Sequence, residues 1–156
     1  MTVSEYTEAV VDFLFDCPYI EKLFFNFAEA ADGNNQLIKD ADVVLKKYID
    51  GGVLRCYTYT IISYIAVSHN PLVDEAGFAD ENMENLANVQ SILDWVSEQN
   101  DQHNYPNFGA DVVIDSMECL TQDPDLNGVD VSQNPPLAKY SFTIRITYLD
   151  NSKALK

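Results

Sequence analysis

The sequence predicts a single α+β domain over residues 1–156, in which a mainly antiparallel β-sheet packs against two amphipathic helices. The chain has 156 residues, 47% of them hydrophobic, and this length suits one domain with one core. Two segments repeat apolar residues at helical intervals, whereas several others are rich in β-branched and aromatic residues. Because these segments follow the order helix, strands, helix, strands, they favour an antiparallel sheet over alternating parallel units.

The first helix is expected at the start of the chain, where Thr2 and Glu5 have the spacing of a capping box. Apolar residues then recur at helical intervals up to Pro18, which discourages continuation of a helix. These residues are Val3, Tyr6, Val10, Phe13, Leu14 and Cys17. After this helix, the alternation of Leu23 and Phe25 favours a strand from about Leu23.

Four further segments are expected before residue 68. Residues 31–36 have the composition of a turn, and residues 43–49 predict a strand. The tripeptide Asp50-Gly51-Gly52 predicts a hairpin turn, because glycine adopts positive φ at little steric cost. Residues 53–67 then predict a long strand that is nearly apolar on both faces, so other elements should cover each side.

The second half of the chain predicts a loop, a helix and two strands. Residues 68–80 are expected to form a loop with one turn of helix, after which Asp80 caps the second helix. The apolar positions of this helix are Met83, Leu86, Val89, Leu93 and Val96, beside Trp95 as a core residue. Residues 110–120 and 137–149 predict strands joined by a loop over residues 121–136, and strict alternation makes the last strand the clearest one.

The charge of the chain is strongly negative and unevenly distributed. The formal net charge is −16, and no basic residue lies between Arg55 and Lys139. Tight nucleic-acid binding needs many basic side chains, so this composition argues against it. The acidic interval predicts either a solvated face or a surface that touches DNA without holding it.

The cysteines and the apolar runs bear on the compartment. Cys17, Cys56 and Cys119 are odd in number and widely spaced, so they favour neither a disulfide framework nor a zinc site, and a reducing compartment is expected. No basic region precedes the first apolar residues, and no apolar run approaches the roughly 18 residues that span a bilayer. A protein that is neither secreted nor membrane-inserted is therefore expected.

One segment has part of a calcium-loop pattern. Asp123, Asp125, Asn127 and Gly128 match the first half of such a loop. The second half does not match, because Asn134 occupies the position of the bidentate glutamate. An ordinary hairpin loop uses the same residue types, so it is favoured, and a calcium-binding interaction module stays a weaker alternative.

No pattern of catalytic residues stands out. His69 and His103 are expected in exposed loops and outside any known metalloprotease or hydrolase motif. The glycines at the predicted hairpin are not followed by the lysine of a phosphate-binding loop. The sequence therefore predicts a protein that is not an enzyme and has no cofactor.

Three stretches of the chain, taken together, carry a family resemblance. They are VLKKYIDGGVLRCYTYTI at residues 44–61, ILDWVSEQN at 92–100 and YPNFG at 105–109. In this pattern the chain resembles the small tail-terminator, or tail-completion, proteins of tailed bacteriophages and prophages, which are often labelled minor capsid proteins. The resemblance extends from Cys17 to Tyr148. It departs at Gly52, where serine is expected, and in the segment 122–136, which is longer than usual.

The resemblance implies a structural virion protein that forms a ring, usually a hexamer, with the single domain as its subunit. Such a ring caps the head-proximal end of the tail tube and joins it to the head-completion complex, while DNA only passes through its acidic lumen. The protein is then expected in the virion tail, after assembly in the bacterial host cytoplasm. Another head-tail connector or adaptor ring is the alternative.

A contact surface for the neighbouring subunit or the tube is expected at the hairpin after residue 43. Its turn is set by Asp50, Gly51 and Gly52. Its contact chemistry is assigned to the basic residues Lys46, Lys47 and Arg55, because electrostatic complementarity fixes the register of an interface. The alternative is an exposed hairpin whose lysines only keep a sheet edge soluble.

Overall fold

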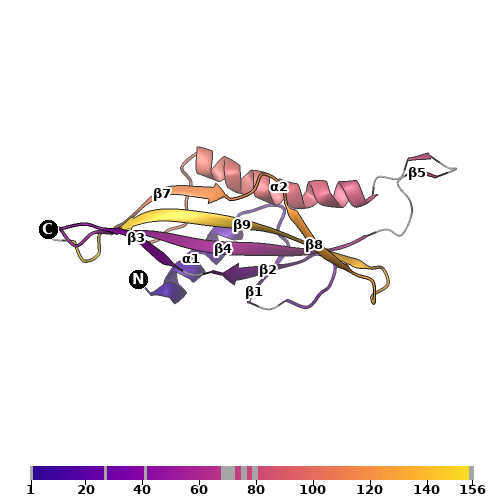
Figure 1. The fold of residues 1–156 in the computed structure, drawn as a ribbon, viewed down its shortest axis with the longest axis horizontal. Helices are drawn as coiled ribbons and strands as arrows, with labels where there is room; N and C mark the ends of the chain where they lie inside the picture. The colour runs from indigo at the N-terminus through magenta and orange to yellow at the C-terminus, as the bar shows by residue number, and fades with distance from the viewer. Residues whose placement is uncertain are drawn as a thin grey trace.

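Two antiparallel strands of 14 residues each, β4 (Val53–Ala66) and β9 (Leu137–Asp150), form the centre of the sheet in a computed structural model of the chain (Figure 1). They are paired over their whole length, from Val53 opposite Asp150 to Ala66 opposite Leu137. The structure describes residues 2–26, 28–40, 42–67, 73–74, 77–78 and 81–154. Their arrangement confirms the predicted α+β class, with a seven-stranded, mostly antiparallel sheet.

Four flanking strands each pair with one part of this central ribbon, and a fifth lies outside one of them. On the β4 side, β2 (Asn34–Lys39) and β3 (Val43–Lys47) pair with different halves of β4, and β1 (Lys22–Phe25) lies parallel to β2. On the β9 side, β7 (Val112–Cys119) and β8 (Asp125–Asp130) pair with different halves of β9. A separate pair of two-residue strands consists of β5 (Val73–Asp74) and β6 (Gly77–Phe78).

One face of the ribbon belongs to the hydrophobic core. Residues that lie opposite each other in an antiparallel pair share a face, so Tyr59 and Ile144 point the same way, as do Ile61 and Phe142. All four are buried. The other face carries half-buried threonines, two of which, Thr60 and Thr143, hydrogen-bond across the strands at 3.0 Å.

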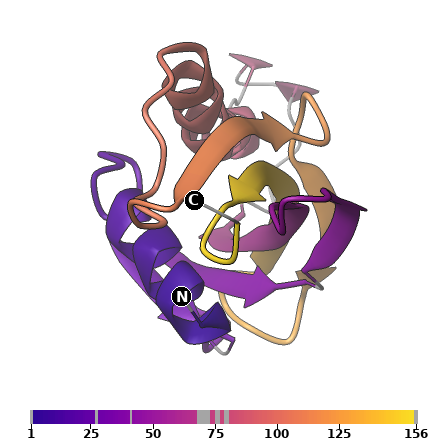
Figure 2. The same ribbon diagram turned by 90° about the vertical axis from the view of Figure 1, so that its left-hand side faces the viewer.

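Both helices cover the core face (Figure 2). The first, α1 (Val3–Leu14), begins with the predicted capping box of Thr2 and Glu5 and ends three residues before Cys17. It is joined to β4 by a hydrogen bond of 2.6 Å between the Thr7 and Tyr57 hydroxyls.

The second helix, α2 (Glu81–Asp101), covers the same face beside β7. It buries Val89, Ile92, Leu93 and Val96 against the sheet. The Trp95 ring lies 5.1 Å from the ring of Phe13, which links the two helices. The predicted cap Asp80 lies outside the described residues.

The turn predicted at residues 31–36 is wrong in its second half, because Asn34 begins β2. This strand buries three polar side chains, and the hydrogen bonds that they make explain how the strand accommodates them. Asn35 Nδ2 donates to the Lys22 carbonyl at 3.1 Å, and Gln36 Nε2 donates to the Asn26 carbonyl at 2.6 Å. Burial of these amides was not predictable from their composition, which is typical of turns.

Two other loop predictions need correction. The predicted loop at 121–136 contains β8, because Leu126 and Val129 pair with β9 around a register shift. Within residues 68–80, the two described parts are the short strands β5 and β6, and the remainder of this segment, with any helical turn, lies outside the described residues. The remaining strand predictions hold, although β3 ends at Lys47 and not at residue 49.

Two valines of α1 provide a test of this packing. Val10 is fully buried against the sheet, whereas Val3 is about half exposed. Val10→Ala should lower the free energy of unfolding by roughly 2 kcal/mol, because it deletes two buried methyl groups. Val3→Ala removes the same atoms from the surface and should change it by less than about 0.5 kcal/mol. Urea denaturation of both variants measures the difference, and equal effects would contradict the helix orientation.

Candidate functional site: the hairpin between β3 and β4

The turn between β3 and β4 is closed by hydrogen bonds within residues 48–52. The Tyr48 N–H donates to the Gly52 carbonyl at 2.8 Å, and the Gly51 N–H donates to the Tyr48 carbonyl at 3.1 Å. Asp50 Oδ1 accepts the Gly52 N–H at 2.9 Å. The three residues assigned to the turn from the sequence therefore form it through their backbone and one carboxylate.

The two glycines of the turn differ in how strongly their surroundings constrain them. Gly51 has φ of +96°, and a Cβ added there would lie 2.5 Å from the Lys153 carbonyl oxygen, because the end of the chain crosses the turn. A Cβ on Gly52 would lie 3.0 Å from Asn151 Oδ1 and 3.2 Å from Asp50 Oδ1. The serine expected from the family resemblance at Gly52 would require these two side chains to shift by a few tenths of an ångström.

The hairpin exposes an unusual number of large apolar side chains. The exposed apolar residues are Val43, Val44, Leu45, Tyr48 and Ile49. We call these five residues, together with Lys46 and Lys47, the hairpin patch. Ile49, at the turn, has 106% relative exposure, so it makes no burying contact within the described chain. Among the described residues β3 pairs with β4 alone, which leaves its other edge without a strand partner.

The two lysines of the hairpin patch are exposed. Lys46 Nζ lies 5.1 Å from the centroid of the Tyr48 ring, a cation–π contact within the hairpin. Within the described ranges, neither Lys46 nor Lys47 has a carboxylate at ion-pair distance. Both charges are therefore available to a partner.

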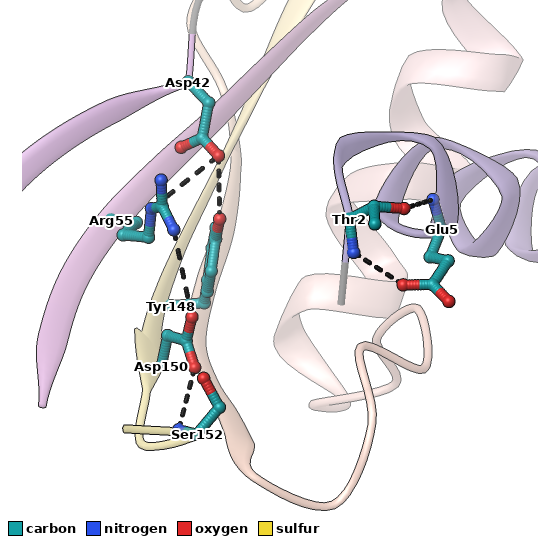
Figure 3. Close-up of polar contacts among 7 residues, drawn as sticks. All are labelled: Thr2, Glu5, Asp42, Arg55, Tyr148, Asp150 and Ser152. Atoms are coloured by element: carbon teal, nitrogen blue, oxygen red, sulfur yellow. Dashed lines mark hydrogen bonds and ion pairs between the residues drawn. The ribbon is translucent and has the colours of Figure 1, made fainter. Parts of the chain in front are cut away.

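Arg55, which the sequence analysis grouped with these lysines, is engaged inside the chain (Figure 3). Its Nε lies 3.8 Å from Asp42 Oδ2, and its Nη1 lies 3.8 Å from Asp150 Oδ2. The side chain of Asp42 is only 8% exposed, whereas that of Arg55 is 33% exposed. Arg55 therefore holds together β4, the end of β9 and the residue that precedes β3.

A tyrosine completes this cluster. The Tyr148 hydroxyl donates a hydrogen bond of 3.0 Å to Asp42 Oδ2. Burial, and then the negative charge of Asp42, raise the pKa of Tyr148 far above its ordinary value, so the hydroxyl remains a donor. Asp150 is also partly buried, which raises its pKa, but hydrogen bonds from Ser152 and the charge of Arg55 outweigh this and lower it.

Sequence reasoning missed Asp42 and Asp150 as partners of Arg55, and Tyr148 as the hydrogen-bond donor to Asp42. The alternation of the last strand places Tyr148 and Asp150 on one face. What brings them to Arg55 is the register, which sets Arg55 opposite Tyr148 and Val53 opposite Asp150. No local pattern in the sequence specifies that register.

The calcium candidates lie on or beside an extended strand. Asp125 and Asn127 belong to β8, and Asp123 precedes it. The side-chain amide of Asn127 donates to the Ser141 hydroxyl, and the Asp123 carbonyl accepts from the Thr121 hydroxyl at 3.0 Å. Within the described residues, no three His, Cys, Asp or Glu side chains gather as metal ligands do. The strand therefore gives a calcium loop no support.

The histidines do not join the hairpin or the ion-pair cluster. His69 lies outside the described residues, and His103 is exposed after α2, with Nδ1 3.0 Å from the Tyr105 hydroxyl. All three cysteines are free, and burial raises the pKa of Cys17 and of Cys119. No helix among the described residues is long and apolar enough to cross a bilayer.

Comparisons with known proteins add no further constraint. No protein-family model matches the chain, and no curated protein matches it.

The role of Arg55 can be separated from that of the neighbouring lysines. Arg55→Met should lower the free energy of unfolding by roughly 2 kcal/mol or more, because it leaves the mostly buried Asp42 without its cation. Lys47→Met deletes an exposed charge and should change the free energy of unfolding by less than about 0.5 kcal/mol. Chemical denaturation at neutral pH compares them. If Arg55→Met leaves the free energy of unfolding unchanged, the cluster contributes nothing to stability.

Gly51 can be tested against a glycine that shares its backbone conformation. Gly33 also has positive φ, +83°, but a Cβ there would meet nothing within 4 Å. Gly33→Ala should cost about 1 kcal/mol of unfolding free energy from backbone strain alone. Gly51→Ala should cost at least about 1 kcal/mol more, because the Lys153 backbone must also move. Equal costs would mean that the chain end moves aside freely.

Proposed function

We propose that the protein is a structural assembly subunit, a ring-forming tail terminator that caps the head-proximal end of a phage tail tube and joins it to the head-completion complex. The family resemblance of residues 44–61, 92–100 and 105–109 supplies this function. The hairpin patch is the observation that supports an assembly role. Apart from Val43, it lies within residues 44–61, one of the three stretches that carry the resemblance.

The hairpin patch has the properties of a surface that a partner covers. Proteins usually protect the edges of their sheets, because an unpaired strand with exposed apolar side chains promotes association. Here β3 is such a strand, with three consecutive exposed aliphatic residues, Val43 to Leu45, and a fully exposed Ile49 in the turn that follows. Exposed apolar groups that gather in this way are typical of interaction sites.

The charge of the hairpin patch fits a partner with acidic groups. Lys46 and Lys47 have no carboxylate partner within the described chain, and the protein as a whole is strongly acidic. A neighbouring copy or the tail tube can supply the opposite charge, and such complementarity sets register and speeds association. The net charge of −16 also suits a conduit, because it repels DNA that passes through.

The test uses the purified protein with polymerised tail-tube protein. We expect particles at one end of each tube in negative-stain images, together with an arrest of tube elongation measured by light scattering. Binding to head-connector particles instead of tubes would identify the other class of ring protein. A protein that ignores the tube would overturn the proposal.

The hairpin patch is tested in the same assay with a double variant. Leu45→Ser with Ile49→Ser should reduce capping at least tenfold, because both side chains are exposed in the free chain and the proposed contact would cover them. Phe15→Ser is the matched control, since Phe15 is similarly exposed but lies at the end of α1. If the double variant caps tubes as well as the wild type, the hairpin is not part of the interface.

A further inference from the structure

We propose that the hairpin patch of one copy binds β8 of a second copy, so that β3 of the first chain becomes the strand next to β8 of the second. This contact deepens the proposed function. The contact itself does not depend on that function, and only the closure of the copies into a ring rests on the proposed function. Its occupant is another copy of this chain. The argument uses the two strand edges, their charges and their directions.

Both strands have an edge without a strand partner. Among the described residues, β3 pairs only with β4, and β8 pairs only with β9. Like β3, β8 and the residue after it expose aliphatic side chains, namely Leu126, Val129 and Val131. Pairing of the two edges would satisfy their backbone groups and bury apolar surface from both chains.

The charges of the two edges are opposite. Residues 123–131 contain three exposed carboxylates, Asp123, Asp125 and Asp130, and no basic residue. Asp130 is tied to its own turn, because its Oδ1 accepts the Ser132 N–H at 3.0 Å and the Ser132 hydroxyl at 2.6 Å. The Asp123 and Asp125 side chains are therefore the natural partners of Lys46 and Lys47.

Charge also disfavours the symmetric alternatives. If β3 paired with β3 of another copy, four lysines would meet, and if residues 123–131 of two copies paired, six carboxylates would meet. Like charges on adjacent strands are destabilising, whereas opposite charges stabilise the pair. The sequence interval without Lys or Arg contains both strands on the β9 side of the sheet, β7 and β8, together with α2 and most of β4.

The strand directions permit an antiparallel ladder. β3 is antiparallel to β4, β4 to β9 and β9 to β8, so β3 and β8 run in opposite directions within one sheet. A second copy that is displaced sideways without being turned over therefore presents its β3 antiparallel to β8. The sheet then continues from one chain into the next.

The two edges lie toward opposite ends of the long axis (Figure 1). Lys46 pairs with Leu54, and Leu126 pairs with Tyr140, which faces Ser63, nine residues further along β4. At ~3.3 Å per residue this is an offset of roughly 30 Å along the strands. Because the contact joins two different surfaces, it repeats from copy to copy. A closed ring then requires strands that are inclined to the ring axis, as in a barrel.

The closing experiment exchanges the charges between the two edges. One variant carries Lys46→Glu and Lys47→Glu, and the other carries Asp123→Lys and Asp125→Lys. We expect each variant alone to associate at least tenfold more weakly than the wild type in light scattering up to about 1 mM protein. An equimolar mixture should regain wild-type mass, because each edge then finds an edge of opposite charge on the other variant.

Matched controls reverse exposed charges elsewhere. Lys22→Glu with Arg145→Glu, and Glu8→Lys with Asp12→Lys, produce the same changes in net charge and should retain wild-type association. Urea denaturation confirms that all variants are folded. A mixture that stays dissociated, or a wild type that is monomeric up to about 1 mM, would overturn the inference.

Chemical cross-linking gives an independent measurement without substitutions. A carbodiimide forms an amide between an amine and a carboxylate that touch, with loss of water. We expect peptides that join Lys46 or Lys47 to Asp123 or Asp125 between isotope-labelled and unlabelled chains. Their absence from assembled protein would contradict the contact. If the protein caps tubes but these cross-links do not form, the proposed function stands and the contact between β3 and β8 is wrong. If the mixed variants associate but do not cap tubes, the contact stands and the proposed function is wrong.

Discussion

The pairing of β4 with β9 over their full length is the constraint on which the rest of the structure depends. It aligns Tyr57, Tyr59 and Ile61 with Ile146, Ile144 and Phe142, and so forms the apolar face that both helices cover. A shift by one residue would turn every side chain of one strand to the opposite face. The same register brings Arg55 to Asp150 and to Tyr148, which holds Asp42. Core and ion-pair cluster therefore specify the same alignment.

Much of this fold follows from local patterns in the sequence. The capping box, the apolar spacing of both helices and the alternation of the last strand each depend on neighbours within a few residues, so they are legible without the fold. The wrong predictions concern segments whose secondary structure depends on contacts with residues far away in the sequence. Asn34 to Gln36 can form a strand because the Glu29, Lys22 and Asn26 carbonyls accept hydrogen bonds from their side-chain amides, and β8 forms because it pairs with β9.

The candidate site was partly predictable for the same reason. A turn rich in glycine between two strand patterns is a local signal, and it identified the hairpin with its glycines and lysines. The exposure of Val43 to Ile49 was not foreseeable, because an apolar strand is as compatible with burial as with an unpaired edge. The separate role of Arg55 depends on Asp42 and Asp150, one of them nearly a hundred residues away in the chain.

The crossing of the turn by the end of the chain has a practical consequence. The Lys153 carbonyl lies so close to Gly51 that any polypeptide joined after this segment would start beside the hairpin patch. An affinity tag or fluorescent fusion placed there would compete with partners for the same surface, and a bulky one would act as a steric cap. A label on the exposed surface of α1, which lies over the opposite part of the sheet from β3, leaves that surface accessible.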